Sequence, residues 1–300
     1  MAALLAANVY VALAISPDLT EILLNGGYTL VASWPLPPFL IEVMRLEGLV
    51  AAASYWAVLG ILVLSFTTLL FRSRTFMQEL GGKISERPSP LYAVVTLFCA
   101  LLLFDIVYYL LLGQYGIQPG TPFTMDPNDQ RLLFSLLHAV VWEEINDRLL
   151  FIGLPIALLI LAGRREGSPL KALLGGTGVG RAEIILIFLS SAVFALSHLP
   201  AWDEWKLLPT FLSGLGMGYL FVRYGLYASI MLHFCFNYLT AVPLYTGSFP
   251  LELLIGLFIL LLVFVGIPYM IKYSRAGVVT MYRVLRHGVN CDESKDRQGF

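Results

Sequence analysis

Two adjacent glutamates and an arginine lie inside an otherwise apolar run of this chain. Residues 142–148 read Trp-Glu-Glu-Ile-Asn-Asp-Arg, between the apolar stretches 132–141 and 149–162. At about 100° per residue, Glu144 and Arg148 lie on one helix face and are predicted to form an ion pair, whereas Glu143 points toward a different neighbour. Ionised groups at membrane depth cost on the order of 3 kcal/mol each, so they mark candidate functional sites. We therefore interpret Glu143 as a candidate general base and Glu144 with Arg148 as its support; the alternative is an ion-pair cluster that only joins two helices.

Two histidines and an asparagine occupy other apolar runs. His198 ends one of them, and His233 and Asn237 are four residues apart in another, so the last two side chains leave the same helix face. A single histidine on an apolar face is usually a core residue. Two histidines, an amide and a glutamate on three different helices instead favour one convergent site. A further acid, Asp105, has no motif around it, and we expect it to partner a buried tyrosine or basic group.

The composition indicates the kind of fold that holds these residues in place. The chain of 300 residues is 58% hydrophobic and only 13% charged, whereas soluble proteins have about 25% charged residues. This predicts an all-α, polytopic membrane bundle that forms a single integral-membrane domain over residues 1–300. Eight spans are expected, at residues 1–15, 49–71, 91–112, 131–162, 182–199, 207–222, 226–245 and 251–270.

Basic residues gather at 72–87, 163–181 and 272–297, and the intervening loops are acidic or neutral. By the positive-inside rule, both termini and the basic tail 271–300 are expected in the cytoplasm. The net charge of −1 gives no basic field for a nucleic-acid partner. The glycine-rich segment 175–180 lacks the lysine of a phosphate-binding loop, and three scattered cysteines indicate neither a disulfide framework nor a thiolate zinc site.

Three short patterns, taken in order, resemble the motifs of the CAAX protease and bacteriocin-processing family, which includes the Ras-converting prenyl endopeptidase. They are Glu143-Glu144 with Arg148, Phe194 with His198, and His233 with Asn237. The glycine-rich approach to the third motif, residues 214–226, is also similar to that of the family. The resemblance covers about residues 132–239, and the sequence departs from the common pattern at Asp147 and Leu149, where an aromatic residue and a glycine are frequent.

The resemblance implies an intramembrane endopeptidase of the glutamate type. Glu143 and His198 would activate a water, His233 and Asn237 would stabilise the oxyanion, and Glu144 with Arg148 would hold the helix. The implied partners are the lipid bilayer and a prenylated or otherwise membrane-embedded substrate, cleaved near its C-terminus. No cofactor is implied.

The chemistry of hydrolysis agrees with these residue types. Water is a poor nucleophile, so it needs a carboxylate base and an imidazole, and the tetrahedral intermediate needs hydrogen-bond donors worth about 3 kcal/mol each. Two histidines and a glutamate could instead bind Zn²⁺, but the His-Glu-x-x-His pattern of zinc proteases is absent. We favour the metal-independent enzyme. A zinc-dependent protease, a proton-coupled transporter and a catalytically silent membrane scaffold are the alternatives.

Overall fold

The computed structural model of the chain describes residues 1–84, 87–120 and 130–287, with side chains as far as residue 279. The N-terminal half contains α1 (Ala2–Ala14), α2 (Ser16–Leu24), β1 (Gly27–Ser33), β2 (Leu40–Glu47), α3 (Gly48–Phe71), α4 (Phe76–Leu80), α5 (Pro90–Gln114) and α6 (Gln130–Glu144). The π-helix η1 (Ile145–Gly153), α7 (Leu154–Leu161), α8 (Pro169–Leu174), α9 (Arg181–Ser197), α10 (Leu199–Trp202) and the 3₁₀ turn η2 (Glu204–Lys206) follow. The chain ends with α11 (Leu207–Tyr224), α12 (Leu226–Asn237), α13 (Ala241–Thr246) and α14 (Phe249–His287).

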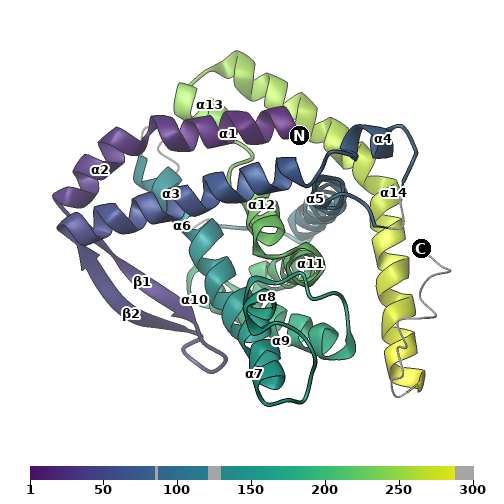
Figure 1. Ribbon diagram of the computed structural model, residues 1–300. Helices are drawn as coiled ribbons and strands as arrows, with labels where there is room; N and C mark the ends of the chain where they lie inside the picture. The colour runs from purple at the N-terminus through teal and green to yellow at the C-terminus, as the bar shows by residue number, and fades with distance from the viewer. Residues whose placement is uncertain (85–86, 121–129, 288–300) are drawn as a thin grey trace.

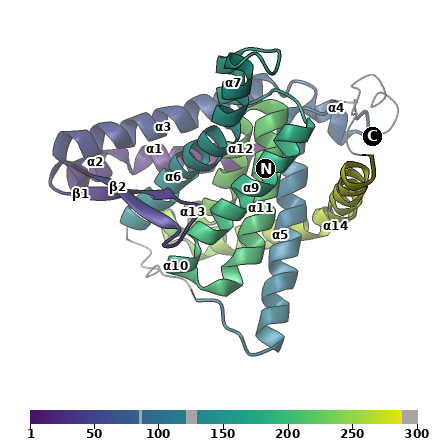
Figure 2. The ribbon, with the colours of Figure 1, turned by 90° about the horizontal axis from the view of Figure 1, so that it is seen from below.

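Helix α12 lies in the middle of a helical bundle. It packs against α3, α5, α6 and α11, and both views of the ribbon place it centrally (Figures 1 and 2). Its eight residues from Ala228 to Cys235 are all buried. A helix that is apolar on every side has its lowest free energy inside a bundle, where it can bury all of its faces. The histidine that α12 carries is therefore largely enclosed by protein.

Four helices of the described residues are long and apolar enough to cross a membrane, namely α3, α5, α9 extended through α10, and α14 up to residue 279. Helices α1 and α2, which are bent by 40° at their junction, form a fifth candidate if they count as one span. In α14 only 17% of the apolar window is buried, and Figure 1 shows this helix at the edge of the bundle. A helical membrane bundle is thus supported, but the predicted count of eight spans is not confirmed.

Two predicted spans are interrupted. The run 131–162 divides into α6, η1 and α7, and Pro155, which lacks an N–H group, stands in the first turn of α7. The run 226–245 divides into the twelve-residue α12 and the short α13. Between α11 and α12 the chain turns at Gly225, whose φ of 117° disfavours any residue with a Cβ.

The prediction of a purely helical fold is wrong at residues 27–47, where an antiparallel hairpin projects from one side of the bundle (Figure 1). Strands β1 and β2 pair from Gly27 opposite Glu47 to Ser33 opposite Leu40. Trp142 on α6 donates a hydrogen bond from Nε1 to the Val31 carbonyl at 2.5 Å. The hairpin therefore rests against the helix that carries the glutamates.

The C-terminal helix packs closely against α5. Hydrogen bonds join Tyr92 to Tyr269 at 3.0 Å and Thr96 to Tyr273 at 2.7 Å, both between hydroxyl oxygens. At Gly266 the two backbones approach so closely that a Cβ would overlap the Cys99 carbonyl. Because α14 continues to His287, the first part of the predicted cytoplasmic tail is helical. Residues 288–300, which include Cys291, lie outside the described residues. The same is true of residues 121–129, between α5 and α6.

Candidate active site

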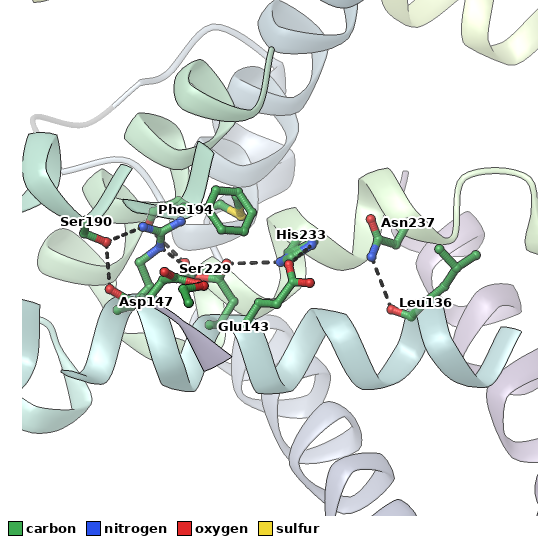
Figure 3. Close-up of polar contacts among 12 residues, drawn as sticks. Leu136, Glu143, Asp147, Ser190, Phe194, Ser229, His233 and Asn237 are labelled. Carbon is green, nitrogen blue, oxygen red and sulfur yellow. Dashed lines mark hydrogen bonds and ion pairs between the residues drawn. The ribbon is translucent and has the colours of Figure 1, made fainter. Parts of the chain in front are cut away.

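Glu144 is the most highly coordinated side chain of the candidate site. Its carboxylate is fully buried and accepts a hydrogen bond from Arg148 Nε at 3.3 Å, one from His233 Nδ1 at 3.1 Å and one from the Ser229 hydroxyl. Glu144 ends α6, Arg148 lies in η1, and Ser229 and His233, labelled in Figure 3, lie on α12. Three donors, one of them cationic, offset the cost of burying this charge. Glu144 therefore has no free oxygen to offer to a reacting molecule.

Arg148 extends this network to a third element. Its Nη1 donates to the Ser190 hydroxyl at 2.5 Å, and Ser190 donates in turn to the Asp147 carbonyl at 2.7 Å. The guanidinium carbon also lies 5.1 Å from the centre of the Phe194 ring, a cation–π distance. Arg148 thus ties η1 to α9, whereas the four-residue spacing predicted only its pairing with Glu144.

Glu143 differs sharply from its neighbour. Its side chain is 29% exposed, and in the described part of the chain it makes no hydrogen bond. Its nearest charged partner is His233, with 3.7 Å between Glu143 Oε2 and the imidazole Nε2. Glu143 is consequently the acid that solvent or a substrate can reach.

His233 stands between the two carboxylates and is only 6% exposed (Figure 3). Because the Glu144 carboxylate is an acceptor, Nδ1 carries the proton of that bond, and Nε2 faces Glu143. A carboxylate behind an imidazole fixes its tautomer and orientation. Nε2 can therefore exchange a proton with Glu143 or donate to a bound group.

His198 is fixed differently. Its Nδ1 lies 2.8 Å from the Phe194 carbonyl oxygen, which only accepts, so Nδ1 bears the proton and Nε2 is left as an acceptor. The Phe194 ring packs edge-on against both His198 and His233, with centroids 4.8 Å and 5.9 Å away. His198 interacts electrostatically with Glu143 without a hydrogen bond to it. The structure thus holds both histidines around one phenyl ring.

Asn237 lies one helical turn beyond His233 and is turned toward α6. Its Nδ2 donates to the Leu136 carbonyl at 3.2 Å, and Figure 3 shows this bond on the far side of His233 from the buried ion pair. One amide N–H is thereby committed to the backbone. Of the predicted residues, His233 contacts both Glu143 and Glu144, Arg148 contacts Glu144, His198 joins them through Phe194, and Asn237 forms no hydrogen bond with them.

Sequence reasoning missed the serines of the site. Ser229 precedes His233 by four residues and Ser190 precedes Phe194 by four, so each shares a helix face with a motif residue. That spacing is the only signal that could have found them. The hairpin contact was missed as well, since Ser33 at the end of β1 donates to the Asp147 carboxylate at 3.1 Å.

Within the described residues, no group of three or more His, Cys, Asp or Glu side chains is arranged to hold a metal ion. The site instead consists of one hydrogen-bonded acid, one accessible acid and two oriented imidazoles. Such a set can take a proton from water and return it to a leaving group.

The comparisons with known proteins agree with this geometry. Residues 130–239 match the model of a family described as type II CAAX prenyl endopeptidase Rce1-like, and this segment contains every residue of the candidate site. No curated protein and no solved structure matched the chain. The resemblance predicted from the three motifs is thereby confirmed for residues 130–239, which are similar to the Rce1-like type II CAAX prenyl endopeptidases.

Proposed function

We propose that this protein is an intramembrane endopeptidase of the glutamate type, which hydrolyses a peptide bond near the C-terminus of a prenylated or otherwise membrane-embedded substrate. The observation that carries the proposal is the unequal environment of the two adjacent glutamates. Glu144 is saturated by three donors, whereas Glu143 is partly exposed and has only an imidazole beside it. A general base must be accessible to the proton that it removes, and only Glu143 meets that condition.

In the proposed reaction, Glu143 takes a proton from a water molecule while His198 Nε2 accepts a hydrogen bond from the same water. The water oxygen then attacks the scissile carbonyl carbon, and the negative charge passes to the carbonyl oxygen. When the C–N bond breaks, the proton held by Glu143 passes to the departing amine. No atom beyond the water and the peptide is consumed.

His233 supports this sequence in two ways. The Glu144 carboxylate behind Nδ1 stabilises a positive charge on the ring, and a protonated Nε2 can donate to the developing oxyanion. Asn237 is the proposed second donor, through the amide hydrogen that the Leu136 carbonyl does not use. Binding to the oxyanion then requires an approach of the substrate along α12.

The apolar surroundings indicate the substrate class. The site lies among membrane helices, so the scissile bond must reach it from the bilayer or its surface. A lipid chain contributes about 0.8 kcal/mol per buried CH₂ to partitioning into the bilayer. The similarity of residues 130–239 to CAAX prenyl endopeptidases also supports a lipid-anchored peptide as the substrate.

The test is cleavage of a prenylated peptide by the purified full-length chain in liposomes. Glu143→Gln keeps the size of the side chain and removes the base, so we expect the rate to fall by about 10²- to 10⁴-fold. The melting temperature should stay within experimental error, because Glu143 makes no hydrogen bond within the described residues. The matched control is Glu42→Gln on the exposed strand β2, which should leave both quantities unchanged. Full activity in Glu143→Gln would refute the proposal.

A further inference from the structure

A second polar cluster lies beside the candidate site, where the turn after α9 meets the C-terminal half of α5. The Lys206 ammonium sits over two indole rings, 4.5 Å from the centre of Trp202 and 5.4 Å from that of Trp205. The Trp205 ring packs edge-on against Tyr109, and its carbonyl accepts a hydrogen bond from the Tyr108 hydroxyl at 3.0 Å. We call Lys206, Trp202, Trp205 and Asp105 the Lys206 cluster.

The charge of this cluster is not neutralised by contact. Over the ranges that the structure describes, no carboxylate forms an ion pair with Lys206, and Asp105 has neither an ion pair nor a hydrogen bond. The expectation that Asp105 partners a buried tyrosine or a basic group is met only through electrostatic interaction with Tyr109 and Lys206, without a hydrogen bond or an ion pair. Burial lowers the pKa of Lys206, and the carboxylates of Asp105 and Glu143 oppose that shift.

Two polar atoms of the Lys206 cluster have unused hydrogen-bonding capacity. Trp205 Nε1 and Asp105 Oδ1 are buried without a hydrogen-bond partner. A buried indole N–H without an acceptor is energetically unfavourable, and in most proteins such groups are paired. Lys206 itself is partly exposed, so an incoming acceptor can reach it. The cluster thus offers a cation and a neutral N–H donor to one acceptor.

The backbone of the turn is strained in a way that fixes this arrangement. Asp203 has φ 65° and ψ 177°, a conformation that is essentially confined to glycine. Strain of this kind persists where the surrounding structure enforces it, often at binding sites. The strained residue lies between Trp202 and Trp205, whose rings pack edge-on with centroids 5.9 Å apart.

The cluster is close enough to the reaction centre to sense its charges. Lys206 interacts electrostatically with Glu143 and with His198, which precedes it by eight residues. A charged end of a peptide bound at Glu143 would therefore also interact with Lys206. The sign of the charge selects an anion, and the nearby Asp105 and Glu143 carboxylates disfavour a doubly charged one.

We propose that Lys206 and the Trp205 indole N–H bind the C-terminal carboxylate of the substrate and so restrict cleavage to bonds near a free C-terminus. This inference rests on the proposed endopeptidase function and adds the source of its positional specificity. Lys206 is a substrate-binding residue in this scheme, and it takes no part in the transfer of protons.

The test compares two prenylated peptides that differ only at the C-terminus, one a free carboxylate and the other a carboxamide. With the full-length protein in liposomes, we expect kcat/KM to favour the carboxylate by about tenfold or more, mostly through KM, as for a hydrogen bond to a charged group. Lys206→Met should bring the ratio near one, and Lys206→Arg should preserve most of it. Trp205→Phe, which removes only the N–H and keeps an aromatic ring, should lower the ratio. Lys171→Met, on the exposed face of α8, is the matched control and should keep the wild-type ratio.

Equal cleavage of the two peptides by the wild-type protein would overturn the inference, as would a preference that survives in Lys206→Met. If Lys206→Met slowed both peptides equally, Lys206 would have a structural role and the carboxylate subsite would be refuted. A binding arm separates this inference from the proposed function. Fluorescently labelled versions of both peptides are titrated against Glu143→Gln and against Glu143→Gln/Lys206→Met, with no need for turnover. Carboxylate preference in the first and not in the second supports the subsite even if no peptide is cleaved, and equal binding refutes it.

Discussion

The buried ion pair between Glu144 and Arg148 gives the most quantitative prediction. Arg148→Met keeps much of the apolar stem and removes the guanidinium. It deletes the 3.3 Å contact with Glu144, the 2.5 Å bond to Ser190 and the cation–π contact with Phe194. Both charged side chains are fully inaccessible to solvent. In the variant, the buried Glu144 carboxylate therefore loses its cationic neighbour, and water cannot take the place of the guanidinium. Breaking one side of a buried pair costs about 3–5 kcal/mol, and we expect a loss of about 4 kcal/mol in the free energy of unfolding.

Reversible unfolding in mixed micelles measures this loss. The control is Arg45→Met, which removes a closer ion pair, at 2.7 Å from Glu47, whose side chains are 67% and 66% exposed. Exposed pairs contribute about 0–1 kcal/mol, so the control separates burial from charge as the cause. The double variant Glu144→Gln/Arg148→Met should lose less than the sum of the two single variants, by about 0.5–3 kcal/mol, because it leaves neither charge unpaired. An Arg148→Met protein as stable as the control would refute the reasoning.

The remaining predictions concern the reaction, the substrate and the packing of the last helix. Exhaustive chelation should leave the cleavage rate unchanged, and elemental analysis should find no stoichiometric zinc; activity that is lost on chelation and restored by Zn²⁺ would contradict the direct action of Glu143. A prenylated or transmembrane peptide should be cleaved far faster than its soluble counterpart in the same liposomes, whereas equal rates would mean that the site opens directly to bulk water. Gly266→Ala should destabilise the protein by about 1–3 kcal/mol, because its Cβ would overlap the Cys99 carbonyl. Gly256→Ala on the same helix has open space and should be neutral or stabilising by up to about 1 kcal/mol, so equal effects in melting experiments would argue against close packing of α5 and α14.

Length and composition predicted the uninterrupted spans well. The expected runs 49–71, 91–112 and 182–199 correspond to α3, α5 and α9 within two residues at each end, because about twenty consecutive apolar residues have one favourable solution in a bilayer. The same criterion failed for residues 131–162, where nine residues adopt a π-helix before Pro155. Apolar composition does not distinguish an α-helix from a π-helix, because it carries no information on the pattern of backbone hydrogen bonds. It also gave no sign that residues 27–47 would pair as strands.

The site was predictable where residues carry charge and unpredictable where they do not. The four-residue spacing from Glu144 to Arg148 predicted a contact that the structure forms. Ser229 and Ser190 complete the same network through hydroxyl groups, and serine is too common in helices to stand out in a single sequence. Lys206 was missed because its partners, two indole rings, lie on the same short turn, which reads in the sequence as an ordinary polar loop.

The different roles of Glu143 and Glu144 follow from the rotation of about 100° between consecutive residues of a helix. Consecutive side chains on a helix diverge by about 100°, so only one of two adjacent acids can face the interior of a bundle. Glu144 faces α12, where Ser229 and His233 are themselves four residues apart, and both reach its carboxylate together with Arg148. Glu143 is thereby turned toward the open side of the same imidazole. A pair of adjacent carboxylates thus supplies both the group that orients His233 and the group that faces the substrate, and an exchange of the two roles would require the whole helix to rotate.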